Sequence, residues 1–92
     1  MDHPALAMLE TDLGLLNPAP AVAAYLNALL EAAGEQIAAK GIALDPGSAA
    51  DLYLLSSYAA WLYRKRDSGG GMPRSLEYEL RNRIVRTAGG ST

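Results

Sequence analysis

Apolar residues recur along the chain at the spacing of α-helices, and one stretch stands out. It covers residues 48–67 (SAADLYLLSSYAAWLYRKRD) and is the most apolar and aromatic part of the chain. At about 100° per residue, one apolar row of a helix here consists of Leu52, Leu55, Ala59 and Leu62. A second row, on another sector of the helix, consists of Leu54, Tyr58 and Trp61. This helix therefore has to be covered twice, either by the other helices of its own chain or by a second copy of the protein.

Three further helices are predicted around this central one. A short helix of about residues 3–13 is followed by a break at Gly14 and the NPAP run of residues 17–20, because proline lacks an amide donor and disfavours helix in its predecessor. A long, alanine-rich helix follows from Pro20 to Lys40, and a last helix begins near Met72-Pro73. The short helix carries Leu6, Leu9, Leu13 and Leu16 at helical spacing. The long helix has Val22, Tyr25, Leu26, Leu29, Ala33 and Ile37 on one face, and the last helix has Leu76, Leu80 and Ile84.

Local signals mark the junctions between these helices. Gly41 is suited to the left-handed position after the long helix. Ser48 and Asp51 have the spacing of a capping box, in which the hydroxyl accepts an orphan amide and the carboxylate reaches back. Gly34, among the alanines of the long helix, either costs helix stability or permits the close approach of another helix. Two acid-to-base pairs at i, i+4 are expected on the last helix: Glu77 with Arg81, and Glu79 with Arg83.

The composition fits a single all-α domain over residues 1–92, with a flexible tail at 88–92. Half of the 92 residues are hydrophobic, which is enough for a modest core. There is no cysteine, and this excludes disulfides and thiolate chemistry. No apolar run approaches the roughly 20 residues of a membrane span, and the N-terminus has no signal-peptide pattern. We expect a soluble, unprocessed chain that does not bind membranes.

Charge divides the chain into two parts. Residues 1–51 hold seven acidic residues and one basic residue, a net charge of −6, whereas residues 52–92 hold seven basic and three acidic residues, a net charge of +4. Such a molecule suits head-to-tail contact between copies as well as it suits nucleic acid. The alternative is that both sets of charges are simply solvated faces.

No constellation of catalytic residues is visible. The single histidine, His3, has no second histidine or cysteine with which to share a metal. The serines have no base at a telling spacing, and the glycines 69–71 are not followed by the lysine of a phosphate loop. We expect no enzyme, no cofactor and no metal site.

Two features remain as candidates for binding. The first is basic: Arg64, Lys65 and Arg66 close the central helix, and further arginines follow at Arg74, Arg81, Arg83 and Arg86. These residues either complement the helix dipole and aid solubility, or bind DNA phosphates or an acidic partner. The second is aromatic and consists of Tyr53, Tyr58, Trp61 and Tyr63, which form either core or a subunit interface.

The order of these motifs resembles one protein family. Residues 58–66 (YAAWLYRKR), a short gap, residues 72–74 (MPR) and residues 80–83 (LRNR) are similar to the head-tail connector, or head-completion adaptor, proteins of long-tailed bacteriophages and prophages. The similarity covers about residues 48–85, and before that only the pattern of helices agrees. The three-glycine gap and the acids Glu77 and Glu79 depart from the family pattern.

The resemblance implies an all-helical structural subunit without catalytic residues. Twelve copies would form a ring under the portal protein, extend the DNA channel without reading its sequence, and join the capsid to the next neck or tail-completion protein. Its place would be the neck of the virion, after assembly in the host cytoplasm. The residues expected at the subunit or portal interface are Leu54, Tyr58, Trp61, Arg64, Lys65, Arg66, Arg74, Arg81 and Arg83.

Two other functions stay open at this point. One is a small helical DNA-binding or regulatory protein that uses the C-terminal arginines. The other is a small tail or assembly protein that shares the fold and forms no ring.

Overall fold

The chain is all-helical throughout the part that the structure describes. This computed structural model describes residues 3–90, without the side chains of residues 67–68 and 86–90, and it contains four helices and no strand within that range. The helices are α1 (Leu6–Leu13), α2 (Pro20–Ala39), α3 (Ala49–Ser68) and α4 (Arg74–Gly90). The predicted fold class, four helices of these relative lengths, is confirmed.

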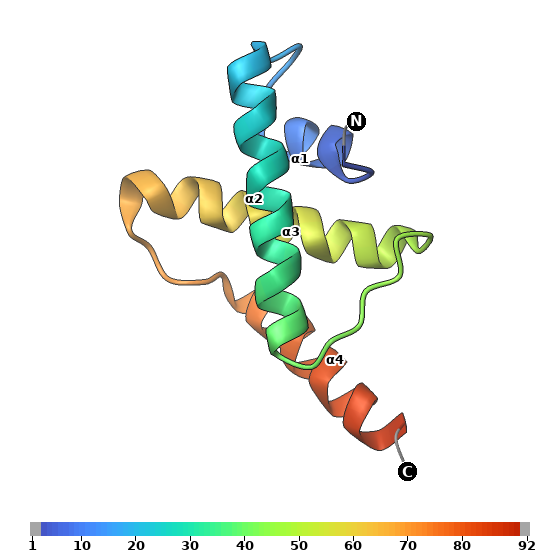
Figure 1. Cartoon of the computed structure of the whole chain (residues 1–92). Coiled ribbons are helices and arrows are strands. Elements are labelled where there is room, and N and C mark those ends of the chain that lie inside the picture. The colour runs from blue at the N-terminus through green and yellow to red at the C-terminus, as the bar shows by residue number, and fades with distance from the viewer. Residues whose placement is uncertain (1–2, 91–92) are drawn as a thin grey trace.

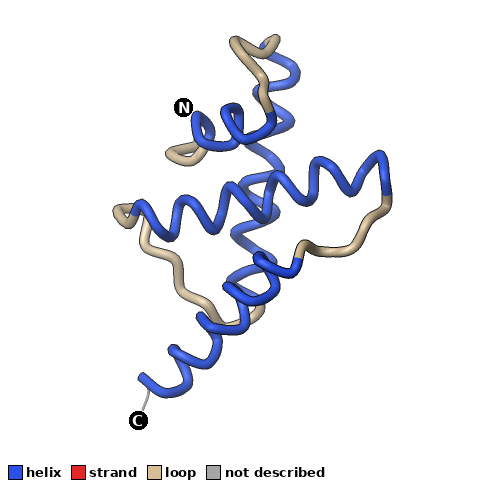
Figure 2. Tube along the Cα trace, turned by 180° about the vertical axis from the view of Figure 1, so that it is seen from behind, coloured by secondary structure: helices blue, strands red, loops and turns tan. Residues whose placement is uncertain are grey.

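Helix α3 is the centre of the arrangement. It crosses α2 and contacts α1, α2 and α4 (Figure 1). The core lies where these helices meet, and its largest fully enclosed side chains are Leu9, Leu26, Leu30 and Ile37. Figure 2 shows from behind that α4 leaves this centre and extends to one end of the molecule, away from α1.

The second apolar row of α3 is covered mostly by its own chain. Leu54 and Tyr58 are only 2% and 3% exposed, and the hydroxyl of Tyr58 donates a 2.8 Å hydrogen bond to Gln36 Oε1 on α2. Trp61 is partly buried. The interpretation of α3 as the wrapped helix of a small bundle is therefore correct for Leu54 and Tyr58, and neither offers a surface to a second copy as the helices stand.

The helix ends agree with the sequence signals in most places. Pro20 occupies the first turn of α2, where no amide donor is needed, and Gly41 follows that helix with a φ of +88°. The expectation for Leu16 was wrong, because α1 ends at Gly14 in a left-handed conformation and the helical period does not reach Leu16. Leu16 is 90% exposed.

The two halves of α4 differ in how they are covered. Leu76 and Leu80 are buried, whereas Ile84 is 40% exposed and Val85 64% exposed. The predicted apolar stripe thus meets the core for two turns and then leaves it. The backbone is helical to Gly90 where a flexible tail was predicted, and residues 91–92 lie outside the described range.

The environment of Gly34 predicts that Gly34→Ala stabilises the protein. A methyl group there would meet Leu55 Cδ1 of α3 at 3.8 Å, an ordinary contact. Because alanine avoids the backbone entropy that glycine loses in a helix, we expect a gain of about 0.5–1 kcal/mol in the free energy of unfolding, measured by urea denaturation. Gly41→Ala is the matched control with the opposite sign, since its positive φ should cost about 1–2 kcal/mol. A loss on Gly34→Ala would show that the helices cannot adjust to the added methyl.

Candidate protein interaction sites

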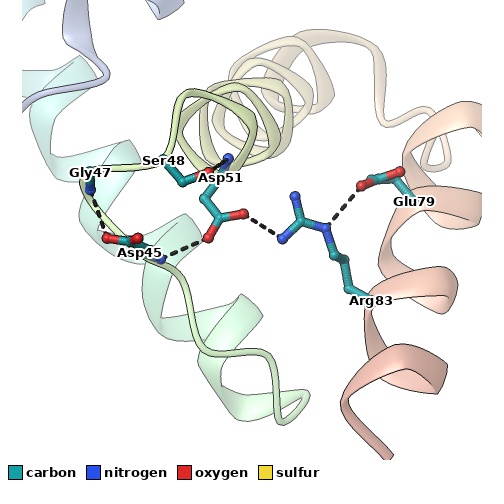
Figure 3. A network of polar contacts seen from close by, with 6 residues as sticks. All are labelled: Asp45, Gly47, Ser48, Asp51, Glu79 and Arg83. Carbon is teal, nitrogen blue, oxygen red and sulfur yellow. Dashed lines mark hydrogen bonds and ion pairs between the residues drawn. The ribbon is translucent and has the colours of Figure 1, made fainter. Parts of the chain in front are cut away.

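A network of hydrogen bonds and ion pairs joins the start of α3 to α4 (Figure 3). Its centre is the Asp51 carboxylate. One oxygen accepts a 2.8 Å hydrogen bond from the Asp45 backbone N–H, and the other lies 2.5 Å from Arg83 Nη1. The Arg83 Nε–H donates to Glu79 Oε1 at 3.0 Å. We call Asp45, Asp51, Glu79 and Arg83 the Asp51 network.

The local sequence explains how this network forms. The Ser48 hydroxyl accepts from the Asp51 N–H at 3.3 Å, which is one half of the predicted capping box. The other predicted contact, from the Ser48 N–H to the Asp51 carboxylate, was wrong. The Ser48 N–H donates to the Asp45 carbonyl, and the Asp51 carboxylate accepts from the Asp45 N–H instead. The Asp45 carboxylate in turn accepts from the Gly47 N–H at 2.9 Å. This turn fixes Asp51 in position to receive Arg83.

The network changes the charge properties of its members. The pKa of Asp51 lies below its ordinary value of 3.8, chiefly because the Asp45 backbone N–H donates to the carboxylate. Burial opposes this effect, and the Arg83 guanidinium adds to the lowering of the pKa. The hydrogen bond with Asp51, followed by that with Glu79, raises the pKa of Arg83. The Asp51 and Arg83 side chains are only 12% and 13% exposed, so this pair is far better shielded than a surface ion pair.

A second site lies at the C-terminal end of α3, where bases stand beside aromatic rings. Lys65 Nζ lies 4.8 Å from the centroid of Trp61, and the Arg66 guanidinium lies 4.9 Å from Tyr63 and 5.2 Å from Tyr25 of α2. These distances are in the range of cation–π contacts. Arg64 donates a 3.1 Å hydrogen bond to the backbone carbonyl of Asp12 on α1. The bases of this end thus contribute to contacts within the chain.

Trp61 itself belongs to the core edge. Its ring packs at right angles against Tyr58, with 5.5 Å between the centroids. The indole Nε1–H is buried and has no acceptor among the residues that the structure describes. An unpaired buried donor costs about 1–3 kcal/mol, so Trp61 is held in place by packing rather than by its polar atom.

The remaining predicted site residues are exposed on α4. Arg74 and Arg81 flank a shallow depression beside Tyr78, which is 67% exposed. The predicted pair of Glu79 with Arg83 is present, whereas Glu77 and Arg81 make no ion pair within the described part of the chain. Arg83 was expected at an interface, and the structure instead directs it inward to Asp51.

Sequence reasoning missed an apolar groove between α1 and α3. The groove has a volume of about 410 Å³, and Tyr53, 68% exposed, forms part of its wall. The residues that line it are Ala7, Met8, Thr11, Asp12, Tyr53 and Ser56. We call it the α1–α3 groove. The sequence held one signal for this groove: Tyr53 lies on neither apolar row of α3, so its ring was the aromatic side chain to expect at the surface.

Comparisons with protein-family models, with curated proteins and with solved structures found no match to this chain. Within residues 3–90, the described side chains form no cluster of three metal-binding groups. None of the described helices combines the length and the apolar character needed to cross a membrane.

The Asp51 network predicts a pH-dependent contribution to stability. At pH 7, Asp51→Asn should lower the free energy of unfolding by about 1–3 kcal/mol, because Arg83 loses its charged partner. The folded-state pKa of Asp51 is lowered, so its contribution is complete above the unfolded pKa of about 3.9 and is lost as the pH falls through the folded value. The difference between wild type and variant, measured by urea denaturation, should therefore shrink below about pH 4. Glu35→Gln, on an exposed position of α2, is the control and should change little. A difference that is the same at pH 7 and pH 3 would contradict this role.

Trp61→Ala separates a core role of Trp61 from an interface role. The contacts with Tyr58 and Lys65 predict a loss of about 2 kcal/mol or more in the free energy of unfolding of the single chain, followed by circular dichroism. Unchanged stability, combined with weaker assembly at equal concentration, would instead make Trp61 an interface residue.

Proposed function

We propose that the protein is a structural neck subunit of a long-tailed phage or prophage. Copies of it form a ring beneath the portal protein, extend the DNA channel, and join the capsid to the next neck or tail protein. The observation that carries the proposal is apolar surface left in water on α4: Ile84, which continues the buried stripe of Leu76 and Leu80, is 40% exposed, and Val85 beside it is 64% exposed.

The energetics of this exposed stripe favour a protein partner. Fully burying a side chain such as Ile or Val stabilises by about 1.5–3 kcal/mol relative to leaving it in water. In the single chain only part of that contribution is realised at Ile84 and Val85, whereas Leu76 and Leu80 are buried. A surface of this kind supports a subunit whose core is extended by a neighbour on assembly.

The distribution of charge supports a contact between unlike faces. Helix α1 carries Glu10 and Asp12 and no base, whereas arginines dominate the charges of α4. When one face of a subunit meets a different face of the next, the assembly is a ring if the rotation between neighbours closes and an open filament if it does not. The proposed neck function requires such a contact.

For the alternative of DNA binding, three of the six arginines make contacts within the chain. Arg83 is paired with Asp51, Arg64 is bonded to Asp12, and Arg66 stacks on two tyrosines. Among the described side chains, Arg74 and Arg81 are the exposed bases of α4. Phosphate contacts by Arg74 and Arg81 alone would give a slope of about −2 in log K against log salt, and the exposed bases at the end of α3 would have to supply any further contacts.

The test is the mass of the protein alone and after mixing with a portal ring. We expect native mass spectrometry and negative-stain electron microscopy to show a defined multimer on the portal, with one copy for each portal subunit. The same mass measurement on the protein alone, at increasing concentration, shows whether the chain forms multimers without a portal ring.

A matched experiment separates the two functions. Binding of a short DNA duplex is measured between about 50 and 200 mM salt, the range over which phosphate-driven binding falls steeply. Tight, salt-dependent binding of DNA together with no association with portal rings would overturn the neck proposal and support the alternative.

A further inference from the structure

Two uncovered apolar features in the described part of the chain lie far apart in the molecule. The α1–α3 groove is at the end that holds α1, and the C-terminal half of α4 extends to the other end (Figures 1 and 2). The molecule measures 47 Å along its longest axis. In this fold, the C-terminal part of α4 therefore cannot fill the α1–α3 groove of its own chain.

We propose that Ile84 and Val85 on α4 of one copy dock in the α1–α3 groove of a second copy. This inference rests on the proposed function and names the surfaces through which the copies meet. The occupant is a second copy because the same chain carries both an apolar groove and an uncovered apolar helix face, and because α1, which lines the groove, has two acids and no base whereas α4 has an excess of arginine.

The groove suits a pair of aliphatic side chains. Ala7 and Thr11 lie one turn apart on α1, Met8 lies beside them, and Tyr53 forms the facing wall on α3. Small residues on one side allow a helix to approach closely, and the methionine and tyrosine provide adaptable apolar surface. Ile84 and Val85 are consecutive and share a face of α4 with Leu80 and Arg81.

Charge orients the docked helix. Arg81 lies four residues before Val85 on the same face, about one helical turn away. Asp12 lines the groove, where its carboxylate is 48% exposed and lies 3.7 Å from Arg64. With Val85 in the groove, Arg81 approaches the exposed side of the Asp12 carboxylate, while Glu77 and Lys40 stand near Arg81 on the α4 side. Opposite charges at the rim set the direction of the helix more than the strength of binding.

The absence of cysteine from the chain makes a direct test available. Thr11→Cys and Val85→Cys both change exposed residues, and the two single variants are mixed at a concentration, or on a portal ring, where assemblies form. Mild oxidation should then join them as a disulfide-linked dimer. Val85→Cys mixed with Glu31→Cys, an exposed position on α2, is the matched control and should give background yield.

The double variant Thr11→Cys/Val85→Cys sharpens the result. Each chain then supplies both ends of the contact, so oxidation should give a ladder of multimers on a denaturing gel. A contact between identical faces would stop at the dimer. Ala7→Cys replaces Thr11→Cys as a second probe of the groove, so that one poorly folded variant does not decide the outcome. Adding Arg81→Glu should lower the cross-linking yield at least about fivefold at low salt, with a smaller effect at high salt.

The outcomes separate this inference from the proposed function. Rings that form while neither groove cysteine joins Val85→Cys would overturn the inference and leave the neck function in place. No assembly, either alone or with a portal ring, would overturn the proposed function and the docking together. A ladder without portal binding would support the docking and overturn the neck role.

Discussion

The fold depends on the burial of α3. This helix is apolar on more than one side, and a helix of that kind is stable in water only when other elements surround it. Helices α1, α2 and α4 all contact it, and the crossing with α2 places Leu26, Leu30 and Ile37 of α2 in the same core as Leu54 and Tyr58. The positions of the other helices thus follow from the need to bury α3, and the polar contacts refine those positions.

Helix α4 is the element that this requirement determines least. Its first two turns reach the core through Leu76 and Leu80, and the Arg83–Asp51 pair fixes its angle to the start of α3. The C-terminal part of the helix extends away from the other helices, as both views show. A well-shielded ion pair stabilises little in net terms, because the cost of desolvation offsets the attraction, yet losing one partner is costly. The pair therefore contributes more to the position of α4 than to the stability of the fold.

The sequence predicted the elements of this fold well and their long-range contacts less well. Three residues marked helix ends through effects that act locally. Pro20 has no amide donor, Gly41 tolerates the left-handed backbone conformation, and the Ser48 hydroxyl accepts a hydrogen bond from a backbone N–H of the first turn. Leu30 was left out of the predicted face of α2, although it follows Leu26 by four residues, lies on the same side of the helix and is fully buried. The partner of Arg83 could not be read from spacing, since 32 residues separate it from Asp51. The local pair with Glu79 was visible and correct, but it concealed the more distant contact.

These long-range contacts explain why the basic residues gave an ambiguous picture. A count of arginines suits a phosphate-binding protein, but such a protein needs its cations exposed to the ligand. Here Arg83 is turned inward and the bases at the end of α3 lie over aromatic rings, so much of the positive charge supports the fold. The apolar positions of α4 were also ambiguous, because a residue that fits a core stripe in the sequence can be exposed in the fold. Ile84 continues a core stripe in the sequence, and only the direction of α4 reveals that the core ends before it. Folding thus leaves apolar surface of α4 in water, while it pairs Arg83 with a carboxylate in the interior.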